Sequence, residues 1–313
     1  MPKDLFEKSS LICNKNDQGG KVRAIAIFNG VQVDKEFTIG PITLRPINTK
    51  TDKFPDGVRR DLQYSVLELN YIDRKTSLSM YAEPMWVQET AFKAIQLMVN
   101  NWTGISLIYH FDESNEQVGG ASGSTRFETA DTESPHAGGV LTVNDENKEL
   151  FKMVFWACLG ELKHAVSRYS RACSEIKDES ILDFVIALEA TLGYKLNSEI
   201  AHRLASRGAF LLGTDSTTRE RYYCILKNLY GIRSRIAHGD SATAKKIPEK
   251  FVEAITTLGY WSGDWSKEID LFKVRHIADV ARQITRQVLL KFVERPVLLN
   301  EDALLRLELG IKK

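Results

Sequence analysis

A stretch poor in large hydrophobic side chains divides this sequence into two parts with different hydrophobic patterns. Of the 28 residues from Asp112 to Gly139, 13 are Gly, Ser, Thr or Pro. Such a composition is typical of a loop or linker. The chain has 313 residues, which is long enough for two cores. We therefore predict an α+β domain at 1–111, a linker or loop at 112–143, and an all-α domain at 144–313.

The first part is predicted to be rich in β-strands. Two apolar runs, Val22–Phe28 and Val31–Val33, are separated by Asn29-Gly30. This pair favours a hairpin turn because both residues tolerate positive φ. A second hairpin is expected from Tyr64–Tyr71 and Ser77–Tyr81.

Two further elements complete the expected α+β domain. Apolar residues recur at steps of three and four in 87–101, which predicts a helix. The segment 105–111 returns to the pattern of a strand.

The part after residue 144 is predicted to be a helical bundle. The Thr217-x-x-Glu220 pattern indicates a capping box at the start of one helix, and Gly213 and Gly239 are expected to end two of them. We expect helices at about 146–175, 178–193, 198–212, 217–238, 249–258 and 267–295, with a short helix from 302.

Charge and motif content exclude several classes of protein. The net charge of +1 excludes a broadly basic surface, so a nucleic-acid contact would need a local patch. No apolar run approaches about 18 residues, and the first ten residues lack the apolar core of a secretory signal. The four cysteines form no CxxC pair and the six histidines form no HExxH group. We expect a cytoplasmic protein with no membrane segment, no metal site and no cofactor.

Three segments of the second part resemble the ApeA-like HEPN family. That family has, in this order, a helix containing Leu-Glu, a helix ending in Leu-Leu-Gly, and a Leu-Tyr…Arg-Ser…Ile…His-Gly motif. The corresponding segments here are ILDFVIALE at Ile181–Glu189, LASRGAFLLG at Leu204–Gly213 and LYGIRSRIAHG at Leu229–Gly239. The resemblance covers about 144–296 and implies an all-α HEPN bundle.

The resemblance implies that Arg233 and His238 are the catalytic pair of a ribonuclease. Histidine can accept or donate a proton near neutral pH, and arginine can bind two phosphate oxygens. On an ideal helix the two side chains point about 140° apart, so convergence needs a loosened helix end, which Gly239 permits. Without the flanking segments, the same spacing fits a histidine that interacts with its own helix end and a surface arginine.

Other residues are predicted to support this pair. Ser234 follows the arginine, where many HEPN nucleases have Asn, Asp or His, and Glu189 is expected to contribute a polar group. Arg235 and Lys227 are predicted RNA contacts, because Lys and Arg outnumber Asp and Glu by eight to three in 216–250. Tyr230 is a third predicted RNA contact, because its ring can stack on bases.

Aromatic and histidine side chains outside the motif have less specific interpretations. Tyr222 and Tyr223, like Tyr230, can stack on bases, although a helical aromatic stripe more often belongs to a core. We expect His164 and His202 to be structural, and the tryptophans of 261–265 to pack beneath the bundle.

The sequence therefore predicts a metal-independent endoribonuclease. Related HEPN proteins act as homodimers, and many serve in antiviral defence by abortive infection. The first domain would then respond to a phage-derived or small-molecule trigger. Two alternatives stay open: a non-catalytic HEPN module for RNA binding or dimerisation, and the toxin of a toxin–antitoxin pair.

Overall fold

The protein is described by a computed structural model in which two compact units are distinguished, Met1–Phe155 and Trp156–Lys313. The described residues are 20–29, 31–39, 42–46, 64–73, 79–98, 105–112, 117–119, 141–173, 177–193, 199–243 and 246–311. The first unit contains sheets and helices, and the second contains only helices within these ranges. An α+β part followed by a helical part is therefore confirmed.

The first unit is built around a six-stranded antiparallel sheet of order β3-β4-β5-β1-β6-β7. The two long central strands are β1 and β5, which pair along ten residues each. The strands are β1 (Gly20–Asn29), β3 (Phe37–Ile39), β4 (Ile42–Pro46), β5 (Tyr64–Asp73), β6 (Ile105–Asp112) and β7 (Gln117–Gly119). A separate parallel pair joins β2 (Val31–Val33) to β8 (Leu141–Val143).

Both predicted hairpins are wrong. The strand before Asn29 is β1, and it is already bonded on its two sides to β5 and β6. No edge of β1 is therefore left for Val31–Val33, which pairs with β8 instead. The second expected hairpin also fails, because Ser79 begins a helix rather than continuing a return strand.

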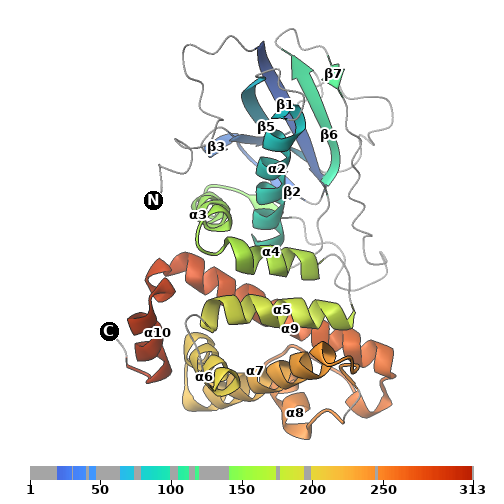
Figure 1. Ribbon diagram of the computed structural model, residues 1–313, viewed down its shortest axis with the longest axis vertical. Coiled ribbons are helices and arrows are strands. Elements are labelled where there is room, and N and C mark those ends of the chain that lie inside the picture. Colours follow the sequence, from blue (N-terminus) through green and yellow to red (C-terminus); the bar gives the residue numbers. More distant parts are fainter. Residues whose placement is uncertain are drawn as a thin grey trace. The chain divides into compact units, whose positions relative to one another are not determined.

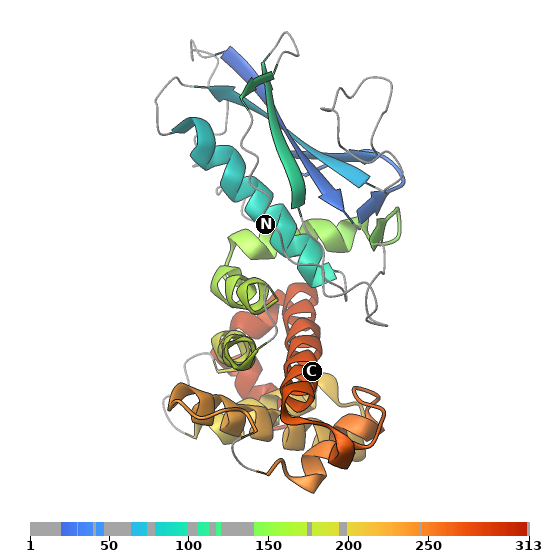
Figure 2. The ribbon, with the colours of Figure 1, turned by 90° about the vertical axis from the view of Figure 1, so that its right-hand side faces the viewer.

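Helix α2 (Ser79–Met98) lies along one face of the large sheet (Figures 1 and 2). Its last two turns bury Ala91, Phe92, Ala94, Ile95 and Leu97. These positions include the three- and four-residue steps from which the helix was predicted. The helix starts earlier than expected, while residues 99–101 lie outside the described ranges.

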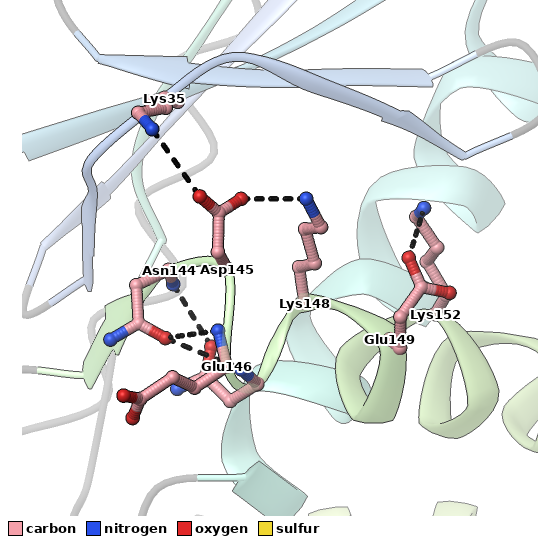
Figure 3. A network of polar contacts seen from close by, with 8 residues as sticks. Lys35, Asn144, Asp145, Glu146, Lys148, Glu149 and Lys152 are labelled. Atoms are coloured by element: carbon pink, nitrogen blue, oxygen red, sulfur yellow. Dashed lines mark hydrogen bonds and ion pairs between the residues drawn. The ribbon is translucent and has the colours of Figure 1, made fainter.

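Asp145 connects β8 and helix α3 (Lys148–Leu159) with the loop after β2, as Figure 3 shows. Its carboxylate accepts a hydrogen bond from Lys148 Nζ at 2.6 Å and another from Lys35 Nζ at 3.3 Å. These two cations, Lys148 first, hold the pKa of Asp145 below its ordinary value. Phe151 adds an edge-to-face contact with Phe37, with ring centroids 5.9 Å apart.

The two units divide within α3, between Phe155 and Trp156, rather than in the predicted linker at 112–143. The physical reason is that β8 and the first turns of α3 pair and pack with the first unit. Most of the Gly-, Ser- and Thr-rich stretch lies outside the described residues.

The second unit consists of helices in the order expected from the sequence. They are α4 (Lys163–Ala172), α5 (Asp178–Leu192), α6 (Ile200–Leu212), α7 (Ser216–Ala237), α8 (Glu249–Thr257), α9 (Asp270–Glu294) and α10 (Glu301–Glu308), with short 3₁₀ segments at Trp265–Lys267 and Pro296–Leu299. Figure 1 shows α5 and α9 side by side, and α6 beside α7. Gly208 allows α6 to approach α7 closely, because a Cβ there would overlap the side chain of Leu226.

The single long helix expected at 146–175 is observed as α3 and α4. The chain turns at Gly160, whose N–H donates to the carbonyls of Trp156 and Ala157, and Lys163 N–H then donates to Gly160 O. Leu162 is buried at this turn. Apolar side chains on both sides of the turn produced a continuous hydrophobic pattern in the sequence.

The capping box of α7 lies two residues before its predicted place. Thr218 N–H donates to Asp215 Oδ1 at 2.9 Å, and Asp215 N–H donates to Thr218 Oγ1 at 3.2 Å. A carboxylate is a favourable acceptor at the positive end of a helix, which explains why Asp215 caps in place of Thr217. The bonds from Thr218 also lower the pKa of Asp215.

Helix α10 is tied to α6 by a buried ionic contact. Arg207 is 1% exposed, and its Nε donates to Glu308 Oε2 at 3.1 Å. Arg203 Nε donates to Glu308 Oε1 at 2.9 Å, and Arg207 Nη1 donates to Leu192 O at 2.7 Å. Burial alone would raise the pKa of Glu308, but the two arginines lower it. The contact therefore neutralises a buried guanidinium.

No helix among the described residues has the length and apolar character needed to span a bilayer.

Candidate active site at the end of helix α7

The end of α7 places His238 directly after the last helical residue. Gly239 N–H donates to Ile236 O at 3.0 Å, and Asp240 N–H donates to Arg235 O at 3.1 Å. These two bonds form the Schellman motif that closes many helices. Gly239 has a φ of +89°, a conformation that a residue with a side chain rarely adopts. The predicted role of Gly239 in ending the helix is confirmed.

Arg233 lies one turn earlier and faces Glu189 on α5. Arg233 Nη2 and Glu189 Oε2 are 3.4 Å apart, and their side chains are 28% and 23% exposed. Burial raises the pKa of Glu189, and the charge of Arg233 partly opposes this rise. The structure thus brings together two residues that the sequence had proposed for one site.

Part of the Arg233 guanidinium has hydrogen-bonding capacity to spare. Its Nε atom is buried and has no hydrogen-bond partner among the described residues. The guanidinium carbon lies over the Tyr230 ring, 5.9 Å from its centre, a distance at which a cation–π interaction is possible. Because this Nε is buried, an anion would contact Arg233 through the exposed part of its side chain, which is 28% exposed overall.

His238 and Ser234 belong to the same end of α7 as Arg233. His238 is exposed and Ser234 is partly buried. Across the described ranges, no hydrogen bond joins either side chain to Arg233 or Glu189. One copy of the chain therefore presents an arginine–carboxylate pair and a separate histidine at the same helix end.

Arg235 has a structural role that the sequence did not predict. Its Nη2 donates to Ala242 O at 3.0 Å, and Ala242 N–H donates to Asp178 Oδ1 at 3.1 Å. Arg235 therefore holds the loop that follows α7. Its predicted contact with RNA stays a prediction.

Lys227 and Tyr230, the other predicted RNA contacts, lie on the outer side of α7 with Tyr223. Lys227 is exposed, and its Nζ lies 5.6 Å from the centre of the Tyr223 ring. Tyr223 and His202 of α6 share a hydrogen bond of 2.8 Å between Oη and Nδ1. The sequence treated His202 as structural, and only the packing of α6 on α7 reveals this contact.

The remaining aromatic side chains belong to the bundle. Tyr222 Oη lies 3.3 Å from Tyr260 Oη, and Tyr260 donates to Gln287 at 3.0 Å. Trp261 packs against His276 with ring centroids 3.9 Å apart and planes tilted by 52°, and it meets Trp265 edge to face. The expected packing of Trp261 and Trp265 against the bundle is therefore observed.

No cluster of three or more metal-ligating side chains occurs in the part of the chain that the structure describes. Cys158 and Cys173 are buried thiols, and Cys224 is a partly buried one.

Comparison of the chain with protein-family models, with curated proteins and with solved structures finds no match. The resemblance to the ApeA-like HEPN family stays a prediction from the sequence.

Proposed function

We propose that the second unit is a HEPN-type endoribonuclease whose catalytic residues are Arg233 and His238. The observation that carries this proposal is the arrangement at the end of α7. A partly buried arginine is held by Glu189 with an unpaired Nε, and an exposed histidine follows at the C-cap of the same helix. Arginine can bind phosphate oxygens and histidine can transfer protons, so the two residues supply two of the functions that cleavage of a phosphodiester needs.

The proposed chemistry is attack by the neighbouring 2′-hydroxyl of RNA. The 2′-oxygen forms a bond to phosphorus while the bond from phosphorus to the 5′-oxygen breaks. A base takes the proton of the 2′-hydroxyl, and an acid gives a proton to the departing 5′-oxygen. Histidine can perform either transfer, and Arg233 would stabilise the charge on the phosphate oxygens. The products are a 2′,3′-cyclic phosphate and a 5′-hydroxyl.

This chemistry predicts cleavage in the presence of a chelator. The purified full-length protein, incubated with total RNA or tRNA in EDTA, should produce 2′,3′-cyclic phosphate ends, because no step requires a metal ion. A His238→Ala variant should leave the RNA intact. Products with 3′-hydroxyl ends, or activity lost on chelation and restored by magnesium, would contradict the proposal.

A second prediction concerns assembly. One chain offers one arginine and one histidine that share no hydrogen bond in the described structure, so we expect two copies to face each other across a two-fold axis. Light scattering at micromolar concentration should then give twice the mass of 35.4 kDa. A monomer with full activity would exclude the composite site.

A non-catalytic module for RNA binding or dimerisation is the second candidate. It is favoured by the lack of a hydrogen bond between Arg233 and His238 in the described structure. A purified protein that binds RNA but does not cleave it would support this second candidate. A role in antiviral defence, a trigger acting on the first unit, and a location in the cytoplasm are further parts of the proposal and rest on the resemblance.

A further inference from the structure

One side of helix α7 carries aromatic and cationic side chains in alternation. Tyr223, Lys227 and Tyr230 follow one another at steps of four and three residues, so they form a row within about 60° of one another on the helix. Arg233 follows three residues after Tyr230, about 60° further round the helix. The neighbouring Tyr222 points about 100° away from Tyr223, and its hydroxyl lies within hydrogen-bond distance of the Tyr260 hydroxyl in the bundle. Two adjacent tyrosines of the same helix thus have different surroundings.

The contacts along this row hold the rings in place. The Lys227 ammonium lies 5.6 Å from the Tyr223 ring centre, and the Arg233 guanidinium carbon lies 5.9 Å from the Tyr230 ring centre. His202 fixes the far end of the Tyr223 side chain through the 2.8 Å hydrogen bond, and its ring meets the tyrosine edge to face. His202 and Lys227 are exposed, and both tyrosines are partly exposed.

The row has the chemistry and the length to bind a strand of unpaired nucleotides. Bases stack on aromatic rings, and the phosphates between them pair with cations. From Tyr223 to Arg233 the helix rises about 15 Å, at about 1.5 Å per residue, which is enough for a few nucleotides. The segment 216–250 also has eight Lys and Arg against three Asp and Glu, which favours a polyanion.

We propose that Tyr223, Lys227 and Tyr230, with His202 supporting Tyr223, form a base-stacking subsite for unpaired RNA next to Arg233. The subsite rests on the proposed function, since it would bind nucleotides that flank the bond to be cut. It selects against duplex RNA, in which the bases are stacked on each other and are not available to the rings.

The test measures the binding of a fluorescent single-stranded RNA oligonucleotide by anisotropy. All proteins carry His238→Ala, which keeps the RNA intact. Tyr223→Leu should weaken binding about tenfold, because one stacked base contributes roughly 1–3 kcal/mol. Tyr223→Phe keeps the ring and should bind nearly as well as the parent. Lys227→Gln should reduce the slope of log affinity against log salt by about 0.7, the contribution of one phosphate contact.

Tyr222→Leu is the matched control, because it changes the adjacent tyrosine, which faces the bundle. Thermal melts identify a temperature at which all variants are folded. The subsite is overturned if Tyr223→Leu binds like its parent, if Tyr222→Leu weakens binding equally, or if the parent does not bind unpaired RNA. Binding that depends on Tyr223 in a wild-type protein that cuts no RNA would leave the subsite standing and overturn only the nuclease.

Discussion

An Arg233→Ala variant should cleave RNA roughly a thousandfold more slowly than the wild type in a single turnover. The expected loss is large because the guanidinium would stabilise charge that develops mainly in the transition state. The measurement is single-turnover cleavage at saturating protein, in which weaker binding does not mask the chemical step. Arg233→Lys keeps the charge but not the planar pair of donors, so we expect an intermediate rate.

The control for this prediction is Lys246→Ala. Lys246 carries the same charge in the same basic segment, but its side chain is 84% exposed and pairs only with the exposed Glu249 in the described structure. Arg235 is a poor control, because its contact with Ala242 holds the loop after α7. If Lys246→Ala is as slow as Arg233→Ala, the effect is general loss of charge and Arg233 is not the catalytic arginine. Thermal melts should accompany the assay, because Arg233→Ala leaves Glu189 without its countercharge.

A Glu308→Gln variant should lose about 3 kcal/mol of the free energy of unfolding of the helical unit. The substitution removes the countercharge of Arg207, which is 1% exposed, and breaking a buried ion pair typically costs about 3–5 kcal/mol. The lower end of that range is expected because Arg207 keeps its hydrogen bond to Leu192 O. Urea denaturation followed by tryptophan fluorescence measures the change, since three of the five tryptophans, Trp156, Trp261 and Trp265, belong to this unit.

Glu294→Gln is the matched control. Glu294 pairs with Lys291 at 2.9 Å, but both side chains are about two-fifths exposed, at 41% and 38%. Such a pair contributes less than about 1 kcal/mol because water screens it. Equal losses for the two variants would show that Glu308 does not neutralise a buried charge.

The helical unit was predictable where the signals are local. Gly239 ends α7 because a left-handed residue closes the helix, and this requirement depends on the glycine alone. The capping box was displaced because two overlapping patterns, from Asp215 and from Thr217, compete within one short segment. The choice between them depends on the turn after α6, where Gly213 N–H donates to Ala209 O.

The sheet was less predictable because strand pairing is not local. Asn29-Gly30 is a strong hairpin signal, yet β1 pairs with strands that begin 35 and 76 residues after it ends. Those partners satisfy both edges of β1 along most of its length. The stabilisation from the longer pairings exceeds what a three-residue partner such as β2 could supply.

The sequence suggested residues for the proposed site but not the contacts that they make. Glu189 and Arg233 were identified separately, and α5 packing against α7 brings them within 3.4 Å. The role of Arg235 in the following loop and the bond between His202 and Tyr223 left no trace in the sequence. Both depend on how one helix is rotated relative to its neighbour, which no short pattern encodes.

The contact between Arg207 and Glu308 joins residues 101 positions apart, and this separation affects when the helical unit can form during translation. A chain is made from its N-terminus, so Arg207, Arg233 and His238 leave the ribosome before Glu308 does. Until α10 has been made and has packed on α6, Arg207 lacks the carboxylate that pairs with it. A chain released early would therefore contain every residue of the proposed active site and still lack a stable bundle to hold them.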